Sequence, residues 1–329
     1  MKYALEIRRG THIEHREFGP KRTIWTPPPS RFNVHDRFNT ASVSKTITAV
    51  TLLQRLEAQG RSIDESIARN LPTNWAIARG IQAITFADLL AHRSGLRDAQ
   101  TAVQGRAGYT YDHVAAAVAA GPAPKDRMAC KTSKTMPDGA PCYQNINYAL
   151  ARELVAMLDG VDAPRKPGAA SSARFVTTVN QVVFSPIGVS PVRYAPDPLV
   201  PTRFFPYPAG QAKGTTYGDW SLRPGSAGAH VSINELVSFT HALFSGALLP
   251  REQLAQMKAR QLGISPYLSL PDGTGCWGKA GYFPGSRNNG AQLSNVIVGC
   301  DNGLRAALVI NGKMSAKTVV LKAVRKHFK

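Results

Sequence analysis

The two ends of this chain carry patterns typical of β-strands, while its middle does not. Residues 3–9 and 12–18 alternate apolar and polar side chains on either side of a Gly10-Thr11 turn, which predicts a β-hairpin. Three further strand-like runs, separated by Gly, Asn and Asp turns, follow near the other end: 276–282, 293–299 and 305–310. Strands must pair to bury their apolar face, so we expect one sheet assembled from both termini.

The segment between the two ends predicts mainly helices. The expected helices are Ser42 to Leu56, one starting at Ser62 or Asp64, Thr85 to about Gly95, one entered over 142–150 and running to about Leu158, about 173–184, Ser232 to about Phe244, one starting near Pro250, and an amphipathic helix over 317–329. Two irregular stretches, roughly 99–141 and 191–224, are expected to be loops that build pocket walls. We predict an α/β (α+β) fold: residues 1–60 and 265–329 form an antiparallel sheet flanked by helices, and residues 61–264 form an inserted, mainly helical domain.

Length and composition narrow the class of protein. With 329 residues, 43% of them apolar and 19% charged, the chain can bury a substantial core in one large or two smaller domains. It has no apolar run long enough to cross a bilayer. The formal charge of +19 raises the question of nucleic-acid binding, but the basic residues are scattered, with no zinc-finger or aromatic-basic RNA motif. We expect no nucleic-acid partner, and the oligomeric state stays open.

Four cysteines bear on the cellular compartment: Cys130, Cys142, Cys276 and Cys300. Their even count permits the disulfides Cys130–Cys142, across a loop, and Cys276–Cys300, between two strand-like runs. Two disulfides would indicate a periplasmic or secreted protein whose leader was removed, since the N-terminus lacks an apolar signal region, whereas free thiols would agree with the cytoplasm. The eight histidines show no His-x-x-x-His spacing, so we predict no metal site and no cofactor.

One predicted helix start carries an unusual pair of residues, Ser42 and Lys45. The helix has apolar side chains on nearly every side, which predicts that it is buried. A lysine three residues after a serine lies one turn away on the same face. Burial favours the neutral amine, which can take a proton from the hydroxyl, and the positive end of the helix dipole favours the alkoxide. A capping serine beside a lysine that reaches solvent is the alternative interpretation.

Three short motifs occur one after another along the chain, and their order indicates a resemblance to a known superfamily. Ser42-Val43-Ser44-Lys45 matches Ser-x-x-Lys, Tyr143-Gln144-Asn145 matches Tyr-x-Asn, and Lys279-Ala280-Gly281, with Pro284-Gly285 after it, resembles Lys-Thr-Gly. With these motifs the chain resembles the serine β-lactamase and penicillin-binding-protein superfamily. It is most similar to the class C β-lactamase-like branch, which also holds family-eight carboxylesterases and D-amino-acid peptidases. Supporting segments extend the similarity over roughly residues 31–312: 85–96, 185–189 and 225–257.

The resemblance implies a β-lactamase-like fold and a catalytic group of three side chains. Ser42 would be the nucleophile that becomes acylated, and Lys45 would accept or relay its proton. Tyr143 would serve as general base, although alone it would be interpreted as an ordinary aromatic residue at a helix start.

The resemblance also implies groups that bind the substrate. Asn145 would hold Lys45 and the acyl-side amide of the substrate. Lys279-Ala280-Gly281 would form the strand beside the substrate, where Lys279 adds positive charge near an oxyanion or a carboxylate; an exposed strand lysine is the alternative. The backbone N–H groups of Ser42 and Tyr282 would form the oxyanion hole.

Two departures from the superfamily pattern bear on the substrate. Ala280 replaces the threonine that helps β-lactamases bind the carboxylate of the antibiotic, which disfavours a dedicated β-lactamase. Trp277-Gly278 resembles the Trp-Gly-Gly that family-eight esterases carry in place of Lys-Thr-Gly, and an alignment shifted by two residues would remove Lys279 from the site. The Gly-x-Ser-x-Gly motif of α/β-hydrolases is absent.

These observations predict a serine hydrolase that works through a covalent acyl-enzyme. The expected substrate is an ester or a small amide or peptide-like molecule, with slow β-lactam hydrolysis as a side activity. The alternatives are a dedicated β-lactamase or D-Ala-D-Ala carboxypeptidase and, in another class, a catalytically silent β-lactamase-like binding scaffold. Intact Ser42, Lys45 and Tyr143 argue against the scaffold, because binding alone does not need all three.

Overall fold

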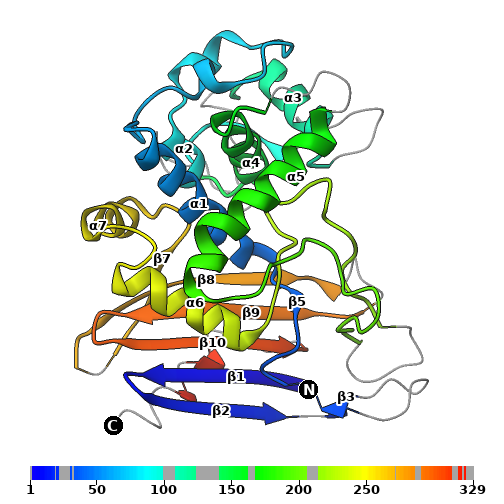
Figure 1. Cartoon of the computed structure of the whole chain (residues 1–329), viewed down its shortest axis with the longest axis vertical. Helices are drawn as coiled ribbons and strands as arrows, with labels where there is room; N and C mark the ends of the chain where they lie inside the picture. Colours follow the sequence, from blue (N-terminus) through cyan, green and yellow to red (C-terminus); the bar gives the residue numbers. More distant parts are fainter. Residues whose placement is uncertain are drawn as a thin grey trace.

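The computed structural model has a β-sheet at one end and a mainly helical part at the other, with a helix lying against the sheet (Figure 1). It describes residues 2–18, 20–21, 30–31, 33–98, 108–123, 141–161, 167–205, 214–270, 272–285, 290–312, 318–320 and 322–323.

Both ends of the chain contribute strands to one six-stranded sheet within the described residues. In spatial order these are β2 (His12–Phe18), β1 (Lys2–Arg9), β10 (Leu304–Asn311), β9 (Leu293–Cys300), β8 (Gly275–Phe283) and β7 (Ser265–Ser269). All neighbours are antiparallel, and β1 pairs with β10 from Lys2↔Asn311 to Arg9↔Leu304. The predicted α/β fold with a sheet built from both termini is confirmed.

The remaining elements lie between these strands in sequence. The described α-helices are α1 (Ser44–Ala58), α2 (Phe86–Leu90), α3 (Tyr111–Ala120), α4 (Ile146–Leu158), α5 (Pro167–Val179), α6 (Ile233–Ser245) and α7 (Arg251–Arg260). Shorter turns are η1 (Ala41–Val43), η2 (Ile67–Asn70), η3 (Arg79–Ala83), η6 (Asn180–Phe184) and η7 (Ser185–Ile187). Two small sheets pair β3 (Pro20–Lys21) with β4 (Ser30–Arg31), and β5 (Phe38–Asn39) with β6 (His230–Val231). The strand β5 of the second small sheet leads directly into η1 and α1.

Local capping explains where two helices begin. At α2 the Thr85 hydroxyl accepts from the Asp88 N–H at 3.1 Å, and the Asp88 carboxylate accepts from the Thr85 N–H at 2.9 Å. At α6 Ser232 and Glu235 exchange the same two bonds at 3.3 and 2.9 Å. Each box satisfies two N–H groups that a helix start leaves unpaired, and both predicted starts are confirmed.

The central strands β1, β10 and β9 are buried on both faces of the sheet because their alternate residues face different clusters. Ala4, Ile297 and Val309 pack with the helices in the main core, whereas Leu5 and Val298 belong to a second cluster on the other face. The helix α1 is buried from Ser44 to Leu53 on every side, as its all-round apolar pattern predicts. Any polar side chain in its first turns is therefore held inside the protein.

One predicted disulfide is present. Cys276 and Cys300 are direct register partners on β8 and β9 and are bonded to each other. Cys142 is also disulfide-bonded, but Cys130 lies outside the described residues, so the Cys130–Cys142 pairing stays a prediction. None of the helices in the described ranges is long and apolar enough to cross a membrane.

Several elements differ from the sequence-based expectation. The helix α3 (Tyr111–Ala120) lies within the stretch 99–141, which was expected to be an irregular loop. Ser42 lies in the 3₁₀ turn η1, and α1 begins only at Ser44. No helix begins at Ser62 or Asp64; the Asp64 N–H donates to the Ser62 hydroxyl at 3.1 Å, and such local side-chain bonds compete with a first helical turn. The strand β7 was not predicted, and its Pro266 is tolerated because β7 lies at the sheet edge.

Two further predicted helices differ in extent. The helix expected over 173–184 begins earlier, at Pro167, and continues beyond Val179 as the π-helical turn η6. Of the segment 317–329, residues 318–320 and 322–323 are helical and the rest lies outside the described residues. The division of the chain into two domains stays a prediction.

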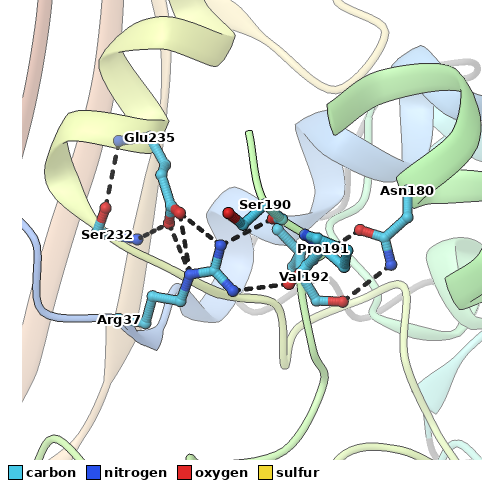
Figure 2. Close-up of polar contacts among 7 residues, drawn as sticks. All are labelled: Arg37, Asn180, Ser190, Pro191, Val192, Ser232 and Glu235. Atoms are coloured by element: carbon cyan, nitrogen blue, oxygen red, sulfur yellow. Dashed lines mark hydrogen bonds and ion pairs between the residues drawn. The ribbon is translucent and has the colours of Figure 1, made fainter. Parts of the chain in front are cut away.

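An arginine–glutamate pair holds the start of the predicted 191–224 loop (Figure 2). The Arg37 Nε donates to both Glu235 oxygens at 3.0 Å, and its Nη2 donates to Oε1 at 2.5 Å. The same guanidinium donates to the carbonyls of Ser190 and Pro191 at 2.8 and 2.7 Å. Because Arg37 directly precedes β5, this forked contact ties the loop to the strand that leads into η1.

The next residues of that loop are held from the other side (Figure 2). The Asn180 amide, in η6, donates to the Val192 carbonyl at 3.0 Å and accepts from the Val192 N–H at 2.6 Å. The carbonyl of Arg193 then accepts from the N–H of His230 in β6 at 2.8 Å. The loop entry is thus joined to both η6 and the small sheet beside η1.

Candidate active site

The turn η1 places Ser42 between β5 and α1. The Thr40 N–H donates to the Ala229 carbonyl at 2.8 Å, and the Ala41 N–H donates to the Asn39 side chain at 3.0 Å. Ala41 has φ +44°, in the left-handed region that residues other than glycine seldom adopt. The hydrogen bonds on both sides hold this sharp turn, and strained backbone of this kind is concentrated at functional sites.

Lys45 lies in the first turn of α1 and is completely buried. Its Nζ donates to Ser42 Oγ at 3.1 Å, to Asn145 Oδ1 at 2.8 Å and to the Ser226 carbonyl at 2.6 Å. These three acceptors match the three N–H bonds of an ammonium, which compensates for its lost hydration. The arrangement keeps the amine within proton-transfer distance of the Ser42 hydroxyl.

Tyr143 approaches the same hydroxyl from the segment before α4. Its Oη lies 2.6 Å from Ser42 Oγ. Lys45 Nζ and Lys279 Nζ lie 4.9 and 5.2 Å from the centre of its ring. Ser42 Oγ therefore has two groups within hydrogen-bond reach that can exchange protons with it, one phenol and one amine.

The His92 ring packs against the Tyr143 ring. The sequence motifs did not single out His92 as a site residue. It follows α2, which ends at Leu90 rather than near Gly95, and has φ +58°. Its ring lies 4.5 Å from the Tyr143 ring, and its Nδ1 accepts from the Gln144 N–H at 3.3 Å. Burial, followed by the charges of Lys279 and Lys45, lowers the pKa of His92 well below its usual value. The imidazole is therefore neutral at physiological pH and acts as packing for Tyr143.

The strand β8 runs against η1 because it has a glycine at the crossing. A Cβ on Gly281 would clash with the Asn295 side chain and come within 2.6 Å of the Thr40 carbonyl. The neighbouring Ala280 is exposed, and Tyr282 is 53% exposed. The close approach of β8 to η1 agrees with a shared oxyanion hole, but the role of the Tyr282 N–H stays a prediction.

Lys279 lies two residues before Gly281 on the same side of β8 and faces Tyr143. Burial lowers the pKa of Lys279 to about 8; nearby Tyr143 opposes this shift and nearby Lys45 adds to it. Trp277, which the shifted alignment would use, is partly buried against the main core. The geometry thus agrees with the alignment on Lys279-Ala280-Gly281.

The structure brings together all the side chains that the motifs predicted, and it adds groups that the motifs did not. Ser226 contributes only its carbonyl, which no side-chain pattern could reveal. Asp98 lies beside Asn145 and accepts from the Ile146 N–H at 2.9 Å. Asp98 comes shortly after Ser94-Gly95-Leu96, the end of the segment 85–96 that supported the resemblance. This closeness in sequence was the one signal that could have pointed to Asp98. Among the described residues, no group of three or more His, Cys, Asp or Glu side chains could hold a metal ion.

Comparisons with known proteins agree with this fold. Residues 22–326 match the family model described as Beta-lactamase. A D-stereospecific amidohydrolase from Streptomyces sp. superposes with a TM-score of 0.68 at 19% identity, over 100% of this chain and 94% of that one. D-amino acid amidase from Ochrobactrum anthropi SV3, complexed with D-phenylalanine, gives 0.69 at 16% identity, over 98% and 92%. A penicillin binding protein from Bacillus halodurans gives 0.62 at 18% identity, over 98% and 96%. The chain therefore belongs to the Beta-lactamase family, within the serine β-lactamase and penicillin-binding-protein superfamily.

Proposed function

We propose that this protein is a serine hydrolase that forms a covalent acyl-enzyme on Ser42. The observation that carries the proposal is the position of Ser42 Oγ, 2.6 Å from Tyr143 Oη and 3.1 Å from Lys45 Nζ. A nucleophile in contact with a base, which is itself held by further groups, is the arrangement that activated hydroxyls require. A binding scaffold has no use for it.

The proposed reaction has two steps. Ser42 Oγ attacks the carbonyl carbon of the substrate while its proton passes to the Tyr143–Lys45 pair, and the oxyanion receives hydrogen bonds from the N–H groups of Ser42 and Tyr282. The intermediate collapses, the carbon–oxygen or carbon–nitrogen bond breaks, and the leaving group takes up the proton. Water then attacks the acyl carbon and Tyr143 accepts its proton; the bond between that carbon and Ser42 Oγ breaks, Oγ takes up the proton, and the acid is released.

Esters and small amides, including amides of D-amino acids, are the proposed substrates. Two of the structural neighbours are named as a D-stereospecific amidohydrolase and a D-amino acid amidase. Directly after Tyr282, the Phe283 ring stacks on Tyr217 at 4.5 Å and contacts Trp220 at 6.1 Å. These rings pack on one another next to the strand segment that carries Lys279 and Gly281. Ala280 in place of threonine still disfavours a dedicated β-lactamase.

The charge of Lys279 predicts a pH dependence that separates anionic from neutral substrates. The amine loses its proton as pH rises through about 8. Above that pH, we expect KM for a carboxylate-bearing ester to rise by up to about tenfold per pH unit, and KM for its neutral analogue to stay flat. Steady-state kinetics from pH 6.5 to 10 on both esters test this, with Lys279→Met as the control that should remove the difference. Equal pH dependence for the two esters in the parent enzyme would contradict it.

Intact-mass measurement tests the proposed function. The protein is incubated in parallel with a penicillin, a short-chain aryl ester and D-phenylalanine amide, with Ser42→Ala as the control. Turnover of ester or amide that needs Ser42 supports the proposal. A stable penicilloyl adduct on Ser42 would instead favour a penicillin-interacting enzyme that deacylates poorly. Labelling or turnover that survives in Ser42→Ala, or silence with all three compounds, would overturn the proposal.

A further inference from the structure

The Asn145 amide has two ends that meet different chemistry. Its Oδ1 accepts from Lys45 Nζ at 2.8 Å. Its Nδ2 lies 3.3 Å from Tyr109 Oη and 3.5 Å from Asp98 Oδ2. The oxygen and nitrogen of an asparagine amide are nearly equal in size, so packing alone does not decide which end faces the lysine. The Lys45 ammonium, which only donates, favours the oxygen end, and a group near the nitrogen end that accepts and cannot donate stabilises the same orientation.

Asp98 is such a group, and it is itself held in place. Its Oδ1 accepts from the Ile146 N–H in the first turn of α4 at 2.9 Å. Its own N–H donates to the Gln144 side chain at 2.9 Å. A carboxylate at a helix start is stabilised by unpaired N–H groups and by the helix dipole. Asp98 is thus bonded to the residues on both sides of Asn145.

Tyr109 completes the surroundings of the Asn145 amide nitrogen. Burial, followed by the charge of Asp98, raises the pKa of Tyr109 to about 12, so its phenol stays protonated at physiological pH. A protonated phenol offers one O–H donor and lone pairs that accept. It can donate to the Asp98 carboxylate and accept from Asn145 at the same time.

We propose that Asp98 is a positioning residue that fixes the orientation of the Asn145 amide and, through Oδ1 of that amide, the place of Lys45 beside Ser42. This inference rests on the proposed function of Ser42. Without the carboxylate, the amide can rotate so that its NH₂ group faces the lysine, where two donors oppose each other. Lys45 then loses one of its three acceptors and shifts away from Ser42 Oγ. A displacement of this size at a reacting group can cost about 100-fold in rate.

A double-mutant cycle tests the inference with a probe that does not depend on the natural substrate. A fluorophosphonate is attacked by a serine hydroxyl, the oxygen–phosphorus bond forms and fluoride leaves, so the labelling rate reports nucleophile activation. The rate is measured in the parent, Asp98→Asn, Asn145→Ala and the double variant, with thermal unfolding of each. Asp159→Asn is the matched control, since this carboxylate bonds Arg55 beyond the opposite end of α4.

We expect Asp98→Asn to slow labelling by about 10- to 100-fold in the parent and by less than about twofold in the Asn145→Ala background. Asp159→Asn should lower stability without slowing labelling. An equal loss in both backgrounds, or no loss in the parent, would overturn the role of Asp98. If Asp98→Asn does not fold, Tyr109→Phe takes its place in the same cycle. A loss of labelling rate that disappears in the Asn145→Ala background supports the inference, and an equal loss of rate in both backgrounds overturns it. A parent enzyme without Ser42-dependent labelling would instead refute the proposed function.

Discussion

Replacing Lys45 by methionine is expected to remove activity while leaving the fold in place. The variant loses the amine that lies 3.1 Å from Ser42 Oγ, and we expect labelling by a fluorophosphonate and ester turnover to fall by at least about 1,000-fold. The three acceptors of its ammonium are neutral groups, so the substitution leaves no buried countercharge among them.

Two opposing terms keep the stability of this variant near that of the parent. The acceptors Asn145 Oδ1 and Ser226 O lose a donor, at a cost of about 1–3 kcal/mol for each group left unsatisfied. The parent, however, carries the cost of holding an ammonium in a fully buried site, which is several kcal/mol and disappears with methionine. We therefore expect the free energy of unfolding to change by less than about 2 kcal/mol.

Thermal unfolding and labelling rates measured on the same samples check this expectation. Lys258→Met, which removes a lysine paired with the half-exposed Asp301, is the matched control and should label like the parent. Retained labelling in Lys45→Met would mean that Lys45 does not activate Ser42. Loss of the folded state would mean that the lysine is mainly structural.

Replacing Tyr143 by phenylalanine is expected to slow turnover by about 100- to 10,000-fold, because it removes the phenol that lies 2.6 Å from Ser42 Oγ. The ring contacts with His92 and the two lysines persist, so the fold should be retained. If Tyr143 also activates water in the second step, the acyl-enzyme should accumulate in the variant during ester turnover, and intact mass would show it as an adduct on Ser42.

Tyr148→Phe is the matched control for the missing hydroxyl. Tyr148 is fully buried, its Oη donates to the Leu90 carbonyl at 2.8 Å, and its ring lies 5.1 Å from the His92 ring. Its loss should cost about 1 kcal/mol of stability without slowing turnover. Equal turnover in Tyr143→Phe and the parent would refute the role of Tyr143 as base.

The elements that the sequence predicted correctly rest on interactions within a few residues. The hairpin of β1 and β2 follows from alternation around one turn, and the start of α6 follows from the Ser232–Glu235 box. The pairing of Ser42 with Lys45 belongs to the same class, since the two side chains lie three residues apart. Tyr143 and Lys279 were found by their motifs, which record a known geometry rather than a local force.

The rest depends on contacts between distant segments. Lys45 meets the Ser226 carbonyl across 181 residues, and Ser42 meets Tyr143 across 101. The hydrogen bonds between Arg37 and Glu235 join residues that are 198 positions apart. Gly281 is required only because β8 crosses η1. Backbone carbonyls and left-handed turns leave no periodic pattern, so Ser226 and His92 could not be recognised in advance. Local propensity therefore predicted most of the helices and strands, while packing of the two chain ends around α1 decided which groups surround Ser42.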